Sequence, residues 1–130
     1  MTGTIHALRI GLDGKVTDLD IGATLDQQSK IISRALLDSV EAVEYIKRPS
    51  GPSIVALAAE HRARQLPNFY AVLAVHVLAG SLGHEIQGPV VFAGYTRSGE
   101  LTALPRDAAA EIRDLCPANP DGIPAIVHIP

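Results

Sequence analysis

The sequence is poor in aromatic, cysteine and charged residues, and each shortage disfavours a class of protein. It has no Trp and only 4% aromatic residues, which disfavours a single-stranded nucleic-acid binder that stacks bases on aromatic rings. The net charge of -3 also argues against a general nucleic-acid binder, since such proteins are usually basic. Cys116 is the single cysteine, so the chain has no internal disulfide, which suits a reducing cytoplasm. The first ten residues lack the basic region followed by an apolar core that marks a signal peptide, so we expect a cytoplasmic protein.

The remaining composition is typical of one packed domain. The 130 residues are 47% hydrophobic and 19% charged, which favours a buried core over disorder. No internal repeat or long linker divides the chain. We therefore expect a single domain over residues 1–130.

The longest apolar segment predicts a helix. Pro67 fits the first turn of a helix, and Asn68 could cap it by accepting a backbone hydrogen bond. Phe69–Ala79 is apolar on every side except at His76, and such a helix is normally buried all round. It is too short to cross a bilayer, which needs about 20 apolar residues.

A strand should follow this helix. Gly88 and Pro89 break the chain, and Val90–Ala93 has the β-branched and aromatic composition of a buried strand. Gly94 either ends this strand or marks a bulge.

The first part of the chain predicts a hairpin and an amphipathic helix. Residues 4–10 and 15–21 alternate in hydropathy around Asp13-Gly14, a common hairpin turn. The alternation slips between Val16 and Leu19, which predicts a bulge there. Thr24 and Gln27 have the spacing of a capping box. The predicted inner stripe of the helix comprises Leu25, Gln28, Ile32, Ala35 and Leu36, and Asp38-Ser39 should end the helix.

Shorter segments complete the predicted architecture. Residues 40–46 and 54–58 could pair as a second hairpin, and residues 101–104 could form a short returning strand. Pro105 should open a helix over 106–115, with Ala109, Ile112 and Leu115 or Cys116 inside. Residues 123–129 could form an edge strand and so support a homodimer. The sequence thus predicts an α+β fold, with a mainly antiparallel sheet built from hairpins and two or three helices packed on it.

Few residues suggest chemistry. His76 stands alone in the apolar helix without an HExxH pattern, so we expect a core or interface histidine more than a general base or metal ligand. His84 and Glu85 share a loop and could act as an acid–base pair, although adjacent residues on an extended loop point apart. The sequence indicates no metal site and no cofactor.

One basic turn could bind an anionic group. His61, Arg62 and Arg64, with Lys47-Arg48 earlier, form the basic concentration of the chain. They could meet a phosphate or an acidic partner surface. A solvated turn is the simpler explanation of these residues.

Two motifs resemble a known family. Leu66-Pro67-Asn68 precedes an Ala-rich helix, and Ile86–Gly94 has the form IxGxVVxxG. With the Asp13-Gly14 hairpin and the helix after Thr24, this order resembles a small domain family of unknown function found in phages, plasmids and integrated elements. The motif before the helix in that family is LPxN, whereas Asn68 directly follows Pro67 here. The resemblance implies a cytoplasmic accessory protein of a mobile element and no catalytic residues.

Three functions remain open from the sequence. The first is a non-enzymatic binding module that contacts a protein partner. The second is a small-ligand or nucleotide binder between the 62–64 and 80–85 loops. The third is an enzyme that uses His76, or His84 with Glu85. The residues proposed for binding are His61, Arg62, Arg64, Asn68, His84 and Glu85.

Overall fold

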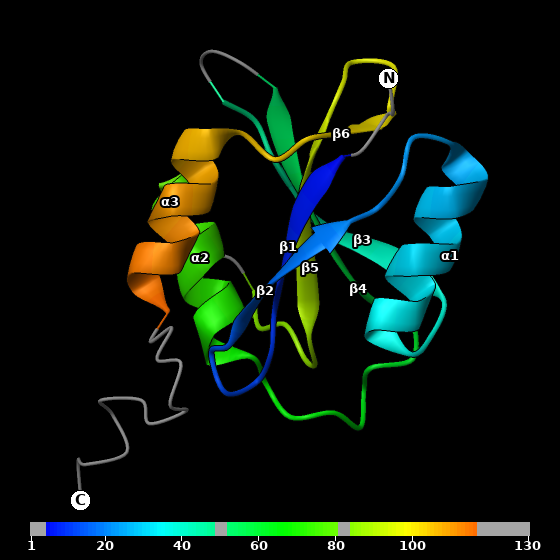
Figure 1. Ribbon diagram of the computed structural model, residues 1–130. Coiled ribbons are helices and arrows are strands. Elements are labelled where there is room, and N and C mark those ends of the chain that lie inside the picture. The colour runs from blue at the N-terminus through cyan, green and yellow to red at the C-terminus, as the bar shows by residue number, and fades with distance from the viewer. Residues whose placement is uncertain (1–4, 49–51, 81–83, 117–130) are drawn as a thin grey trace, which may run out of the picture.

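The chain folds as a sheet covered by helices on both faces. In the computed structural model, the described residues are 5–48, 52–80 and 84–116, and they form six strands and three helices. In chain order these are β1 (His6–Ile10), β2 (Val16–Asp20), α1 (Leu25–Leu36), β3 (Val40–Ile46), β4 (Ser53–Ala59), α2 (Phe69–Ala79), β5 (Val90–Tyr95), β6 (Leu101–Thr102) and α3 (Arg106–Leu115). Figure 1 shows α1 on one side of the sheet and both α2 and α3 on the other.

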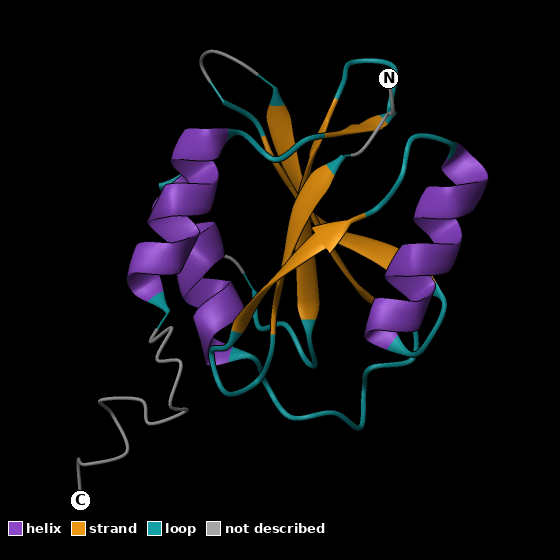
Figure 2. Cartoon of the chain, in the orientation of Figure 1, coloured by secondary structure: helices purple, strands orange, loops and turns teal. Residues whose placement is uncertain are grey.

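All strand pairings are antiparallel. The order is β2-β1-β5-β4-β3, and β6 pairs with the far end of β5. Both predicted hairpins are present, because β1 pairs with β2 and β3 pairs with β4. The predicted α+β fold with an antiparallel sheet is therefore confirmed (Figure 2).

The bulge lies in a different strand from the one predicted. The β1–β2 register runs without a shift from the His6–Asp20 pair to the Ile10–Val16 pair, so a bulge after Val16 is wrong. The register shifts instead in β3, between Ala42 and Glu44. The change in hydropathy alternation led to the wrong prediction because Val16 and Leu19 lie on opposite faces of the hairpin. Val16 packs against one core cluster and Leu19 against the other.

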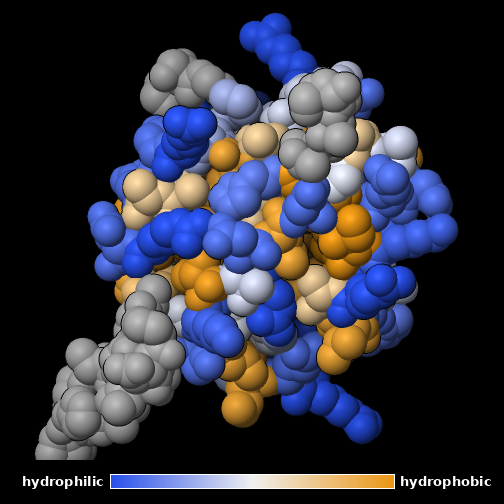
Figure 3. Space-filling model, in the orientation of Figure 1, coloured by the Kyte–Doolittle hydropathy of each residue, from blue (hydrophilic) through white to orange (hydrophobic). Residues whose placement is uncertain are grey.

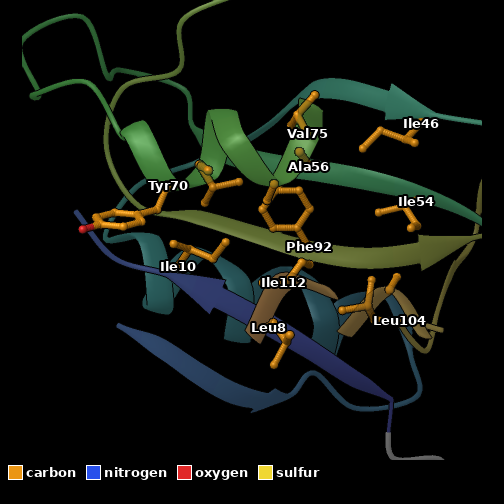
Figure 4. Close-up of a cluster of buried hydrophobic side chains, with 14 of the residues drawn as sticks. Leu8, Ile10, Ile46, Ile54, Ala56, Tyr70, Val75, Phe92, Leu104 and Ile112 are labelled. Atoms are coloured by element: carbon orange, nitrogen blue, oxygen red, sulfur yellow. The ribbon is translucent and has the colours of Figure 1, made fainter. Parts of the chain in front are cut away.

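The core consists of two layers separated by the sheet. One layer lies under α1 and is built around Ile32, Leu36 and Val91. The other lies under α2 and α3 and is built around Phe92 and Ile112, as Figure 4 shows. Because β4 and β5 are central, nearly all their residues are buried, and their unbroken apolar runs serve both layers.

Helix α1 begins as predicted and buries the predicted stripe except at its first residue. Thr24 and Gln27 form the capping box. Gln28, Ile32 and Leu36 are buried, whereas Leu25 is 80% exposed, so its place in the inner stripe is wrong. Leu25 is the first residue of the helix, beyond the part that lies over the sheet. The helix ends at Leu36, before the predicted Asp38-Ser39 stop.

The prediction that α2 is buried all round is wrong. Tyr70, Ala71, Ala74 and Val75 are buried, but His76 and three apolar residues are exposed. The helix lies over one face of the sheet beside α3, so only its sheet-facing side is covered (Figure 1). Apolar composition alone did not reveal that no further layer covers the other side within the described residues.

The later elements agree with the sequence, with one difference at Gly94. Strand β5 continues in register to Tyr95, so Gly94 neither ends it nor forms a bulge. A Cβ at Gly94 would lie 2.5 Å from the backbone oxygen of Ala103, which explains the glycine. In α3, Ala108, Ala109 and Ile112 are buried. The edge strand predicted at residues 123–129 falls outside the described residues.

Asn68 connects three parts of the chain from a fully buried position. Its Nδ2 donates hydrogen bonds to the backbone oxygens of Ile10, at 3.1 Å, and Gly88, at 2.9 Å. Its Oδ1 accepts a hydrogen bond from the backbone amide of Ala71 and so caps α2. Buried polar groups are stable only when they are paired in this way. Asn68 therefore joins the end of β1, the approach to β5 and the start of α2.

Replacing Asn68 by Ala should destabilise the fold strongly. Asn68→Ala removes all three hydrogen bonds between Asn68 and buried backbone groups, so the free energy of unfolding should fall by about 3 kcal/mol. Urea denaturation followed by circular dichroism measures the change. Thr24→Ala, which removes the exposed cap of α1, is the matched control and should cost about 1 kcal/mol. Equal losses in the two variants would contradict this role of Asn68.

Replacing Tyr70 by Phe should cost little or should stabilise the protein. Tyr70 is 8% exposed, and its buried hydroxyl oxygen has no hydrogen-bond partner among the described residues. In Figure 4 this oxygen lies at the edge of the cluster and points away from Phe92. Tyr70→Phe removes an unpaired polar group, so the free energy of unfolding should stay level or rise by about 1 kcal/mol. A clear loss in thermal unfolding would contradict the absence of a partner.

Candidate functional site

One side of α2 presents apolar residues to solvent without any charged residue. Phe69, Leu73, His76 and Val77 follow one another at steps of four, three and one, so they lie on the same side of the helix. Phe69 is 66% exposed and Val77 is 39% exposed. We call these four residues the outer face of α2. Leu66, three residues before Phe69, is 70% exposed as well.

The opposite side of α2 fixes this face in place. Ala71 and Ala74 are completely buried, and their small side chains let the helix lie close to the sheet. Asn68 caps the first turn, and Gly80 ends the helix in a left-handed conformation. The helix also contacts α3 and β3. The outer face of α2 is thus carried by a rigid element.

His76 belongs to this outer face and not to the core. Of the two places predicted for His76, the core is wrong, because His76 is exposed on the helix surface, while the interface stays a prediction. Figure 3 shows, for the face of the molecule drawn there, that hydrophobic areas lie among hydrophilic side chains. A helix side with three apolar residues and no Asp, Glu, Lys or Arg is unusual on such a surface, since charged residues normally cover it.

A second feature is a recess between β2 and the start of α3. It encloses about 610 Å³. Its lining residues are Ile5, His6, Asp18, Leu19, Asp20, Ala103, Leu104 and Arg106. Four of these residues are apolar, and the other four carry both acidic and basic groups. Such a recess could hold a small molecule that bears both charges.

Asp18, which lines this recess, contacts side chains from two other parts of the chain. Nε2 of His6 lies 2.7 Å from Oδ1 of Asp18, and Arg113 pairs with the same oxygen. The hydrogen bond from His6, followed by that from Arg113, lowers the pKa of Asp18 below its usual value of 3.8. The carboxylate of Asp18 therefore stays ionised at neutral pH, between the imidazole of His6 and the guanidinium of Arg113.

The recess contains acid–base groups but no hydroxyl or thiol nucleophile among its lining residues. Sequence reasoning did not single out His6 or Arg113. A signal for His6 existed, because the Asp13-Gly14 hairpin pairs His6 with Asp20 and brings it next to Asp18. Arg113 could not be found in this way, since it lies 95 residues from Asp18 along the chain.

The predicted basic turn is largely engaged by acidic side chains. The backbone amide of His61 donates to Oδ2 of Asp38, and its Nδ1 lies 3.2 Å from Oδ1. Arg62 donates to Oε1 of Glu41 at 2.6 Å and to the backbone oxygen of Ala59. Arg64 is exposed. Two of the three predicted binding side chains therefore already have a carboxylate partner.

The other predicted binding residues do not join this turn. His84 and Glu85 are both exposed; Nδ1 of His84 lies 3.6 Å from Glu44, and Glu85 accepts a hydrogen bond from Gln87. Arg62 and His84 thus contact two different glutamates of β3 and not each other. Asn68 is completely buried, and its polar atoms bind the backbone of this chain. Residues 81–83 of the predicted second loop lie outside the described residues.

Two further features offer little chemistry. A shallow depression of about 460 Å³ lies along α1 and is lined by Ser29, Lys30, Ser33, Arg34, Asp38 and Ser39. Cys116 is buried, and this burial raises the pKa of its thiol to about 11, so it stays protonated at neutral pH. Within residues 5–48, 52–80 and 84–116, no group of three or more His, Cys, Asp or Glu side chains is placed to hold a metal ion.

Comparisons of the chain with protein-family models, curated proteins and solved structures found no match. Among the helices that the structure describes, none has both the length and the apolar character needed to span a bilayer. The functional argument therefore depends on the surface and the contacts of this chain alone.

The contact with Asp38 should raise the pKa of His61. Its hydrogen bond to Asp38 raises the pKa of His61 above 6.5, and Asp38→Asn should return it towards that value. The pKa of His61 is higher in the folded than in the unfolded protein. The stabilisation of the folded state by the His61–Asp38 contact is therefore fully present below pH 6.5 and is lost as the pH rises through the folded pKa. NMR titration of the ring protons measures this change. Asp26→Asn, which removes the partner of Lys30, is the control and should leave His61 unchanged.

Proposed function

We propose that the protein is a non-enzymatic binding module that acts through protein–protein contacts at the outer face of α2. This proposal keeps the cytoplasmic setting and the link to a phage or other mobile element that the family resemblance implies. The observation that carries it is the exposure of Phe69 and Val77 on a helix that contains no Asp, Glu, Lys or Arg.

The energetic argument concerns the unused apolar surface. Burying apolar surface contributes about 25 cal/mol per Å², so an exposed phenylalanine on a rigid helix is a strong candidate anchor for a partner. Aromatic residues are enriched among the side chains that dominate protein–protein binding. A partner would find this face already ordered, because Asn68 and the buried alanines fix the helix before binding.

The positions of the titratable groups support binding over catalysis. His76 lies on the helix surface, and His84 lies beside Glu44 on β3. The recess beside β2 pairs His6 with Asp18, but its lining offers no hydroxyl or thiol for them to activate. The structure supports a ligand site at the basic turn less than the sequence did, since His61 and Arg62 are already paired with carboxylates.

A photo-crosslinker should locate the contact surface. A photoreactive phenylalanine analogue at position 69 should give a discrete covalent adduct in cells that express the full chain, because Phe69 would lie inside the interface. The same analogue in place of Leu25, which is 80% exposed on α1, is the control and should give none. Gel electrophoresis and mass spectrometry identify the adducts.

Two outcomes would contradict the proposal. The first is the absence of a discrete adduct at position 69. The second is the same adduct at both positions, since this would reflect random collision. Adding Val77→Lys to the chain with the analogue at 69 should abolish the adduct, because an unpaired charge would then enter the interface.

A further inference from the structure

The recess between β2 and the start of α3 carries one charge of each sign that no side chain of the described residues pairs. We propose that this recess binds a small zwitterion, with an ammonium group at Asp20, a carboxylate at Arg106 and an aliphatic chain between these two ends. The inference goes beyond the proposed function, because the recess and the outer face of α2 share no residue.

Asp20 supplies the negative charge of this site. Its Oδ1 accepts a hydrogen bond from the backbone amide of Gly22 at 3.1 Å, and no basic side chain within the described ranges forms an ion pair with it. The other carboxylate of the recess, Asp18, is already bound by His6 and Arg113. Asp20 therefore remains able to attract a cationic group of a ligand.

Arg106 supplies the positive charge. The arginines that form ion pairs in the described part of the chain are Arg48, Arg62 and Arg113, and Arg106 is not among them. Arg106 is exposed and is the first residue of α3. A guanidinium group binds a carboxylate through two parallel hydrogen bonds, so a carboxylate is the ligand group that fits Arg106 best.

The two charges come from opposite sides of β1. His6 is aligned with Asp20 of β2, and on the side away from β2 the backbone oxygen of His6 accepts a hydrogen bond from the amide of Leu104 at 2.9 Å. Hydrogen-bonded strands lie about 4.8 Å apart, so the backbones of Asp20 and Leu104 are about 10 Å apart. Arg106 follows Leu104 by two residues, where the chain enters α3 (Figure 1). A ligand that reaches both charges therefore needs them at opposite ends of a chain.

The recess also offers apolar surface. Ile5 and Leu19 are partly buried and Ala103 is exposed, so each keeps surface that a ligand can cover. Burial of this surface favours a ligand whose charged ends are joined by an aliphatic chain. The volume of about 610 Å³ lies within the range of small-molecule sites.

The mixed charges disfavour simpler ligands. An anion would be repelled by Asp18 and Asp20, and a cation by Arg106 and Arg113. An uncharged apolar molecule would displace water from these groups without pairing them. A zwitterion with separated charges pairs both Asp20 and Arg106.

Four related compounds test the charges and their spacing. 6-Aminohexanoate has its two charges at opposite ends of an aliphatic chain, and its isomer norleucine has both at one end, whereas hexanoate and hexylamine carry one charge each. NMR titration of the full chain measures binding through the backbone amides of Leu19 and Ala103. The shifts should saturate with 6-aminohexanoate, at a dissociation constant at least about fivefold lower than that of the other three compounds, because only this compound pairs both charges.

Removal of either charge tests its role. Arg106→Gln and Asp20→Asn should each raise the dissociation constant of 6-aminohexanoate about fivefold, since one ion pair is lost. Asp20→Asn keeps an oxygen that can accept the hydrogen bond from Gly22. The matched control Arg97→Gln, at an exposed arginine outside the recess lining, should leave the constant unchanged. Thermal unfolding verifies that each variant is folded.

Four outcomes would overturn the proposal. The absence of a saturable shift with 6-aminohexanoate would overturn the site itself. Equal affinity for norleucine would overturn the spacing of the charges, and equal affinity for hexanoate or hexylamine would overturn the zwitterion. Unchanged binding in folded Arg106→Gln and Asp20→Asn would overturn the roles of these two residues.

One further compound identifies the source of the zwitterion. The dipeptide leucyl-leucine also separates its two charges by an apolar body. Tighter binding of this dipeptide than of 6-aminohexanoate supports a short apolar peptide as the ligand, and the reverse order supports an amino acid with a terminal amine. Failure of all these titrations leaves the proposed function standing, because the crosslinking experiment reports on α2, a separate surface.

Discussion

The fold depends on one buried amide. Asn68 binds the end of β1 through Ile10, the approach to β5 through Gly88 and the first turn of α2 through Ala71. These segments are far apart in sequence, and the β1–β5 pairing joins the two halves of the sheet. A side chain with both donors and an acceptor is needed here, since a hydrophobic residue would leave the backbone groups unpaired in the core. The position of α2, and therefore its outer face, follows from this contact.

The sheet has two covered faces, but the coverage is unequal. Helix α1 lies alone over one face, while α2 and α3 share the other. Helices α1 and α3 are amphipathic, and their buried residues lie on the side that faces the core. Helix α2 carries apolar residues on both sides. Its outer side is exposed to water, although the residues there are of the kind found in a core. This mismatch between composition and environment is the main functional clue in the structure.

Most elements were predictable because their signals are local. The capping box at Thr24, the Asp13-Gly14 turn and the apolar run of β5 depend on neighbours along the chain. The candidate site was harder to predict. Asn68 was identified as a cap, but its bonds to Ile10 and Gly88 require the assembled sheet. The His6–Asp18–Arg113 cluster likewise requires α3 to lie beside β2, which no local pattern indicates.

The sequence by itself determined the elements, their antiparallel class and the absence of charge on α2. These properties come from turn chemistry, capping and hydropathy over a few residues. Tertiary structure alone decided which side of α2 is covered, which carboxylates engage His61 and Arg62, and that His76 is exposed. The physical reason is that burial is a property of layers: a helix rich in apolar residues is buried only where another element lies over it.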